Sequence, residues 1–141
     1  MTQSNALRML TASFIAAALS SCSVTPRTAI RVDIDAEPML LASGPIVMIR
    51  VRTYDWNSPG RNTIGTTDFR LGAGGTMVPF SLTVAPRDLN APTQSLGVEV
   101  SGWSVSAPPA STQPVIRHRI HTGFRANELL VVSVQIGRAH V

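Results

Sequence analysis

From residue 29 onward, apolar and polar residues alternate in short runs that are separated by turn-forming residues. Successive side chains of a β-strand point to opposite faces of a sheet, so this alternation is typical of strands with one buried face. The clearest runs predict five strands, around Ile30–Ile34, Val47–Arg52, Val78–Val84, Val98–Val100 and Leu130–Gln135. Weaker runs at Thr63–Leu71 and Val115–His121 predict two more.

Three local features refine this pattern. Pro79 cannot donate a hydrogen bond to a ladder, so its strand is expected at the edge of a sheet. The alternation of Val98 and Val100 changes phase before Trp103, which predicts a β-bulge at Gly102. The segment Ser104–Pro114, rich in Ser, Ala and Pro, predicts a long loop.

Seven short strands without a helical period predict a single all-β domain, an antiparallel β-sandwich over residues 29–135. In layout this pattern resembles immunoglobulin-like or transthyretin-like domains, although no sequence hallmark of either family is present. The resemblance implies two packed sheets and says nothing about activity. The full length of 141 residues suits one such domain.

The first residues have the three parts of a secretory signal peptide. Arg8 supplies positive charge, and Met9–Leu19 is an apolar run of 11 residues. This run fits the roughly 7–15 residues of a signal peptide and is shorter than the about 20 needed to span a bilayer. The following Leu19-Ser20-Ser21-Cys22 resembles the lipobox of bacterial lipoproteins. Residues 1–21 are therefore predicted to be a lipoprotein signal peptide.

The lipobox resemblance implies that Cys22 becomes the lipidated first residue of the mature chain, with residues 22–28 as a tether. Several acyl chains on one residue give stable membrane anchoring. Cys22 is the sole cysteine, so no disulfide is expected within this sequence. The residue after it is Ser23 rather than Asp, which implies, by the enteric sorting rule, an outer-membrane anchor facing the periplasm.

The last six residues, Ile136–Val141, resemble the translation of a common sequencing adapter that ends in a stop codon. Residues 136–141 are therefore predicted to be non-native, with the natural chain continuing beyond about residue 135. The codons of this segment decide the matter, and no role is assigned to Arg138 or His140.

All 12 basic residues are arginine. Between Cys22 and Gln135, 10 Arg against 8 acidic residues leave a net charge of +2. The closest arginines are the pairs Arg50/Arg52 and Arg117/Arg119, and alternate spacing puts each pair on one face of its strand. Because the charge is distributed, we expect no nucleic-acid partner.

Tyr54 and Trp56 are the candidate ligand-binding side chains. Trp56 precedes the turn at Asn57–Gly60, so the two rings are candidates for an exposed platform on which a sugar stacks. The alternative is that both rings cover the end of a sheet and that Trp103 belongs to the core.

No metal site or cofactor is predicted. Asp33, Asp35 and Glu37 alternate along a strand end and so share one side, but they lack the glycine and closing glutamate of a calcium loop, and a solvated strand end is favoured. His118 and His121 are three residues apart and should face opposite sides of a strand, so they should not bind one ion. No nucleophile motif or catalytic triad pattern is present, and no catalytic residue is predicted.

These observations favour a lipid-anchored envelope protein that acts as a non-enzymatic binding or structural module, with an envelope protein or a glycan as partner. One alternative is a carbohydrate-binding module that uses Tyr54 and Trp56. Another is the N-terminal part of a longer enzyme, interrupted near residue 135.

Overall fold

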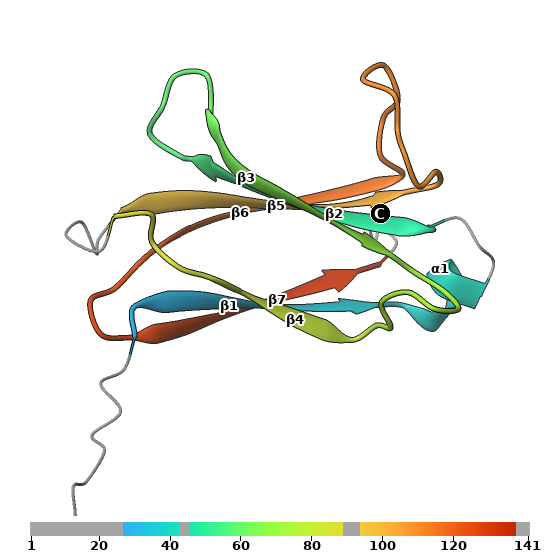
Figure 1. The fold of residues 1–141 in the computed structure, drawn as a ribbon, viewed down its shortest axis with the longest axis horizontal. Helices are drawn as coiled ribbons and strands as arrows, with labels where there is room; N and C mark the ends of the chain where they lie inside the picture. Colours follow the sequence, from blue (N-terminus) through green and yellow to red (C-terminus); the bar gives the residue numbers. More distant parts are fainter. Residues whose placement is uncertain (1–26, 43–45, 89–93, 138–141) are drawn as a thin grey trace, which may run out of the picture.

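The computed structural model describes residues 27–42, 46–88 and 94–137. In this part of the chain two β-sheets lie face to face as a sandwich (Figure 1). The strands are β1 (Ala29–Ala36), β2 (Met48–Asp55), β3 (Thr63–Arg70), β4 (Phe80–Val84), β5 (Ser95–Trp103), β6 (Ile116–Gly123) and β7 (Leu129–Ile136). Every predicted strand is present, and the all-β sandwich is confirmed. The predicted signal peptide and Cys22 lie outside the described residues.

The strand order is β4-β1-β7 in one sheet and β3-β2-β5-β6 in the other. All neighbours are antiparallel except β1 and β7, which run parallel from the Ala29–Leu129 pair onward. The purely antiparallel arrangement expected from the sequence is therefore corrected at this pair. Alternation within a strand reports which side chains are buried, and it carries no information about which strand lies next to it.

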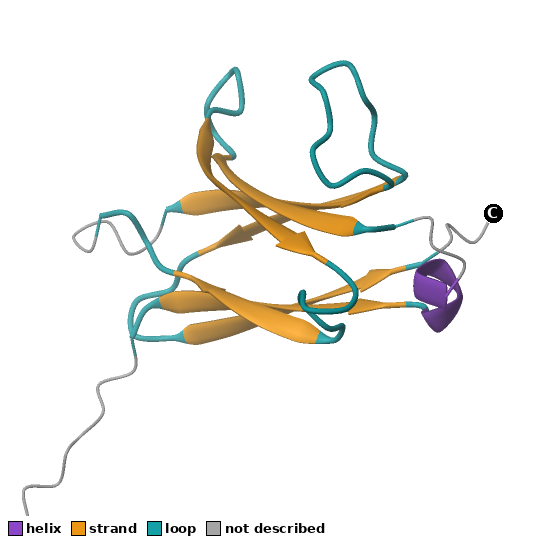
Figure 2. Ribbon diagram, turned by 45° about the vertical axis from the view of Figure 1, so that its right-hand side comes forward, coloured by secondary structure: helices purple, strands orange, loops and turns teal. Residues whose placement is uncertain are grey.

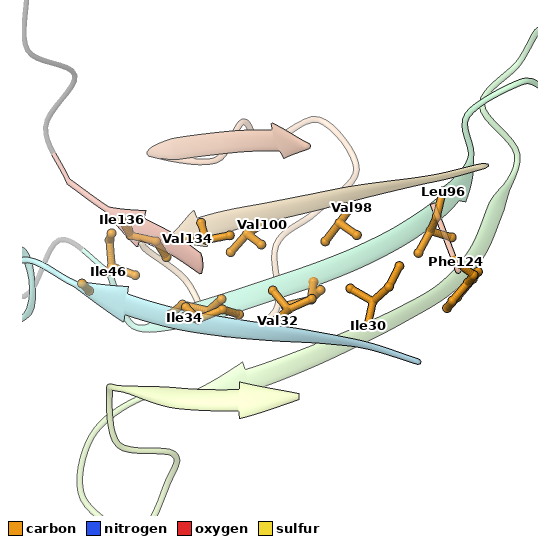
Figure 3. Packing of buried hydrophobic residues seen from close by; sticks show 13 residues of the cluster. Ile30, Val32, Ile34, Ile46, Leu96, Val98, Val100, Phe124, Val134 and Ile136 are labelled. Atoms are coloured by element: carbon orange, nitrogen blue, oxygen red, sulfur yellow. The ribbon is translucent and has the colours of Figure 1, made fainter. Parts of the chain in front are cut away.

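Side chains from both sheets meet in a shared apolar core (Figure 3). Ile30, Val32 and Ile34 of β1 are at most 1% exposed, and Val98 and Val100 of β5 are fully buried. Burying an aliphatic side chain of this size contributes about 1.5–3 kcal/mol. The apolar positions that predicted the strands are thus the ones that hold the two sheets together.

The β-bulge predicted at Gly102 is wrong. Gly102 pairs in regular register with Ile49 on one side and Ile116 on the other. The change of phase has another cause. Both faces of β5 are buried, so apolar residues occur in both of its rows of side chains, and Trp103 belongs to the row that faces away from the core. The irregularity in this sheet lies instead at Thr53/Tyr54, in the ladder between β2 and β3.

Two connections rise from the four-stranded sheet on the side away from the other sheet (Figures 1 and 2). One is the turn between β2 and β3, and the other is the loop between β5 and β6, where the long loop Ser104–Pro114 was predicted. They stand over opposite parts of the sheet's outer face. This outer face is therefore framed by loops, whereas its inner face is covered by the core.

Two smaller features complete the fold. The strand after Pro79, β4, pairs with β1 alone and lies at the edge of its sheet, as predicted. The short helix α1 (Pro38–Ala42) was not predicted, because one turn is too short to show a helical period. Within the described residues, no helix has the length and apolar character needed to cross a membrane.

Candidate binding face on the four-stranded sheet

Strand alternation and register together bring the arginine pairs to one place. Arg52 on β2 lies across from Glu99 on β5, and Glu99 lies across from Arg119 on β6. Arg50, Ser101 and Arg117 form the neighbouring row in the same way. Because residues two apart on a strand share a face, both rows belong to the outer face of the four-stranded sheet.

Glu99 is the centre of this face. Its Oε2 atom accepts a hydrogen bond from Arg119 Nε at 2.6 Å, and it lies 3.5 Å from Arg52 Nη2 and 3.7 Å from Arg117 Nε. The Glu99 side chain is only 10% exposed, whereas the three arginine side chains are 30–43% exposed. The hydrogen bond to Glu99 raises the pKa of Arg119 above its ordinary value. One largely buried carboxylate is therefore shared by three partly exposed guanidinium groups, which leaves an excess of two positive charges.

Arg50 is held separately, at the β3 side of the face. Its Nε and Nη2 atoms donate to the two carboxylate oxygens of Asp68 at 2.7 and 2.9 Å. These hydrogen bonds lower the pKa of Asp68 and raise that of Arg50. The guanidinium carbon of Arg50 also lies 5.4 Å from the centre of the Trp103 ring, and Trp103 Nε1 donates to Ser101 Oγ at 2.9 Å. Trp103 is thus buried on the outer face, outside the core between the sheets.

The aromatic residues form the next row of the same face. Tyr54 is fully buried, and its ring covers Gly97. Trp56 is partly buried and stacks on His121, with ring centres 4.2 Å apart and planes 9° apart. The guanidinium carbon of Arg61, from the β2–β3 turn, lies 5.4 Å from the centre of the Trp56 ring. The predicted exposed platform of two rings is therefore corrected, because the buried Tyr54 ring offers no surface to a sugar. Of the two predicted stacking residues, Trp56 alone is within reach of solvent.

Two polar atoms under this row have no hydrogen-bond partner among the residues that the structure describes. They are the Tyr54 hydroxyl and Arg52 Nε, and both are buried. An unpaired buried polar atom costs about 1–3 kcal/mol, so structures tend to keep such atoms only where something offsets them. Both atoms belong to residues of the arginine and aromatic rows.

The other candidate residues are not brought together. Asp33 faces outward on the three-stranded sheet, where Ser81 and Arg31 donate hydrogen bonds to it. His118 lies in the inward row of β6 and His121 in its outward row, on opposite faces as predicted. In the described ranges, no group of three or more His, Cys, Asp or Glu side chains is arranged to hold a metal ion.

Sequence reasoning placed each arginine pair on one face but missed Glu99. The sequence does contain a sign of this residue's role, because Glu99 is a lone charged residue between two valines in an apolar run. Its partners lie on β2 and β6, so its role depends on strand order. Comparison of the chain with models of protein families, and separately with curated proteins, gave no match.

Proposed function

We propose that this chain is a lipid-anchored, non-enzymatic binding module of the bacterial envelope, and that it holds an anionic polymer on the outer face of its four-stranded sheet. The observation that carries the proposal is the ratio of three guanidinium groups to one carboxylate around Glu99. Anchoring at Cys22 and an envelope location rest on the lipobox resemblance.

The charge on this face favours an anion as ligand. Arg50 is neutralised by Asp68, but within the described part of the chain Arg52, Arg117 and Arg119 share Glu99 as their one acidic partner. A guanidinium group presents several N–H donors in a plane and binds carboxylate or phosphate oxygens through two of them at once. Carboxylate or phosphate groups on the polymer would neutralise the two positive charges that Glu99 alone does not balance.

The surroundings of the arginines favour a chain-like ligand. The β2–β3 turn and the β5–β6 loop stand on either side of the face (Figure 2). Trp56, stacked on His121, lies beside the arginine row and is partly accessible. An acidic polysaccharide would place its charges on the arginines and a sugar ring against the Trp56 side of the face.

The chain provides its own probe for this proposal. It has two tryptophans, Trp56 and Trp103, and both lie on this face. We expect polygalacturonate and polyphosphate to change the intrinsic fluorescence of the full chain in detergent. Added salt should weaken the change because it screens exposed charges. Uncharged dextran should have no effect.

Paired variants test the assignment. Replacing Arg117 and Arg119 by Gln should weaken polyanion binding by about tenfold for each arginine that is replaced. Arg31→Gln is the control, because Arg31 is a partly exposed arginine on the other sheet whose carboxylate partner is Asp33. If no polyanion changes the fluorescence, or if the control weakens binding equally, the proposal is wrong.

A carbohydrate-binding module that recognises neutral sugars is the second candidate. The partly accessible Trp56 ring is the observation that favours it. This function predicts fluorescence quenching by dextran or another neutral glycan, unaffected by salt and abolished in Trp56→Ala. A response to polyanions that disappears at high salt would decide against it.

A further inference from the structure

Arg61, in the turn between β2 and β3, is an exposed arginine without an acidic partner. Among the described residues no carboxylate lies within ion-pair distance of its guanidinium group. All 8 acidic residues of the sequence fall inside the described ranges, so the other segments of this sequence have no acidic side chain to offer. β7 ends at the opposite end of the sandwich from this turn (Figure 1). The positive charge of Arg61 is therefore available to a ligand.

Two aromatic rings hold the Arg61 side chain. Its guanidinium carbon lies 5.4 Å from the centre of the Trp56 ring and 5.9 Å from the centre of the Tyr54 ring. A guanidinium group on an aromatic ring is held through its flat face, and its N–H donors point outward from its edge. In the described part of the chain these donors make no hydrogen bond. The rings therefore fix the position of Arg61 without using the groups that would bind an anion.

The turn that carries Arg61 is itself tightly hydrogen-bonded. Asp55 Oδ1 accepts a hydrogen bond from Asn57 N at 2.9 Å. Ser58 Oγ donates to Asp55 O at 3.1 Å and accepts from Asn62 N at 2.7 Å. Arg61 N donates to Ser58 O at 3.0 Å, and its φ of 47° is in the left-handed region, which arginine rarely adopts. Arg61 is thus held in place before any ligand arrives, and such preorganisation lowers the cost of binding.

Arg61 extends the charge of the arginines around Glu99 toward Trp56. Arg52 and Tyr54 are successive outward residues of β2, about 7 Å apart along the strand. The guanidinium carbons of Arg52 and Arg61 lie 5.2 and 5.9 Å from the centre of the Tyr54 ring. Within the described ranges, Arg61 is the one arginine that also lies over the Trp56 ring. The face thus has two positively charged places, and the second is beside a partly accessible aromatic ring.

We propose, on the basis of the proposed function, that Arg61 is a second anion subsite of this face and that the ligand is a polyuronate. A polyuronate carries one carboxylate on each sugar. One carboxylate would bind the guanidinium groups around Glu99, and a second, further along the chain, would bind the free N–H groups of Arg61. A sugar ring of the same chain would lie against Trp56. A ligand with a single carboxylate could occupy only one of the two places.

The first test is calorimetric titration of the full chain in detergent with hexagalacturonate. Calorimetry is used because Arg61 touches Trp56, so the substitution itself would alter the fluorescence. Arg61→Gln should weaken binding by about tenfold, the cost of losing one charged hydrogen-bonding partner. Arg61→Asn should do the same, and it keeps the turn even if Gln disturbs it, because asparagine adopts the left-handed conformation more readily.

Arg70→Gln is the matched control. Arg70 lies at the end of β3, two residues beyond Asp68 and on the same outer face. It is exposed, and within the described ranges it also lacks an acidic partner, but no aromatic ring holds it. The substitution removes the same charge from the other side of the arginines around Glu99, and it should leave the affinity for hexagalacturonate within about twofold of the wild type. Equal weakening by Arg61→Gln and Arg70→Gln would show that net charge alone matters and would overturn the second subsite.

Arg61→Lys separates charge from geometry. Lysine keeps the charge but has no planar group to lie on the rings and to present two donors to one carboxylate. We expect this variant to bind hexagalacturonate more weakly than the wild type and more tightly than Arg61→Gln. Binding as tight as that of the wild type would mean that the aromatic rings do not position the ligand-binding group, and the proposed geometry would be wrong.

Nuclear magnetic resonance of the wild type reports on Arg61 directly. The side-chain Nε–H signal of Arg61 is identified by its absence from the spectrum of Arg61→Gln. Hexagalacturonate should shift this signal together with that of Arg119. If the signal of Arg119 moves and that of Arg61 does not, the second subsite is refuted and the proposed function stands. If hexagalacturonate and longer polyanions fail to bind the wild type at all, both are refuted.

Discussion

The ring of Tyr54 occupies the space that a side chain at position 97 would need. Tyr54 on β2 and Gly97 on β5 are direct partners in the antiparallel ladder. A Cβ atom built on Gly97 would overlap the ring carbons of Tyr54. The absence of a side chain at Gly97 is therefore what allows Tyr54 to lie flat on the sheet and to be fully buried.

We expect Gly97→Ala to destabilise the fold by about 1–3 kcal/mol, the usual cost of forcing extra atoms into a packed site. The added methyl group would push the Tyr54 ring away from the sheet and disturb Trp56, whose ring centre lies 6.1 Å from that of Tyr54. Thermal unfolding followed by circular dichroism measures the stability, and tryptophan fluorescence reports the displaced stack.

Gly123→Ala is the control for this change. Gly123 also lies on the four-stranded sheet, but its added Cβ would be 3.5 Å from the nearest atom, which is ordinary contact. It should change stability by less than about 0.5 kcal/mol, as surface substitutions usually do. Equal destabilisation by the two substitutions would contradict the packing of Tyr54 on Gly97.

The ion pair between Arg50 and Asp68 predicts an acid-dependent loss of stability. The hydrogen bonds from Arg50 hold the pKa of Asp68 below its ordinary value of 3.8. A carboxyl group whose pKa is lower in the folded state stabilises the fold at pH values above 3.8, and this contribution is lost as pH falls through the folded-state pKa.

Urea unfolding of the wild type and of Asp68→Asn, compared between about pH 6 and pH 2, measures this contribution. Because the pair is partly exposed, we expect a difference below about 1 kcal/mol near pH 6. The two curves should converge as the pH falls below the folded-state pKa of Asp68. A difference that stays constant down to pH 2 would show that the effect of the substitution is not electrostatic.

The strands could be predicted from the sequence because most of them bury one face only. Ile30, Val32 and Ile34 alternate with charged residues, and this alternation is the packing pattern of β1. β5 is a central strand buried on both faces, so its pattern does not alternate, and the sequence suggested a bulge at Gly102 that is absent. The sequence rule fails where both faces of a strand are covered.

The binding face could be predicted only in part, because it depends on strand order. The sequence places Arg50 with Arg52 on one face, but it does not show that β2 and β6 both pair with β5. That pairing puts Arg52 and Arg119 on either side of Glu99. Such contacts join residues far apart in the chain, and a pattern that extends along one strand cannot reveal them.

The lipobox resemblance predicts the outcome of Cys22→Ala. Without the sulfur atom no diacylglycerol can be attached, so metabolic labelling of the chain with a palmitate analogue should disappear. The chain should also keep its signal peptide, because the lipoprotein peptidase acts after lipidation, and it should run as the larger precursor on a gel. Ser23→Ala is the matched control and should be labelled normally. Labelling that persists in Cys22→Ala would refute the anchor.

Replacing Glu99 by Gln should have opposite effects on stability and on binding. The change leaves Arg52, Arg117 and Arg119 without a counter-charge, and the positive excess rises from two to three. Loss of one partner of a buried ion pair costs about 3–5 kcal/mol. Here the arginines are partly exposed to water, so we expect Glu99→Gln to lower the free energy of unfolding, measured in urea, by about 1–3 kcal/mol.

The same Glu99→Gln variant should bind polygalacturonate and polyphosphate more tightly than the wild type, because the ligand no longer competes with the carboxylate for the guanidinium groups. Asp68→Asn is the comparison, since it frees Arg50 at the β3 side of the face and should strengthen binding less. A Glu99→Gln chain that is less stable and also binds polyanions more weakly would mean that Glu99 only organises the sheet. In that case the arginine row is a structural network, and the ligand must be sought elsewhere on the molecule.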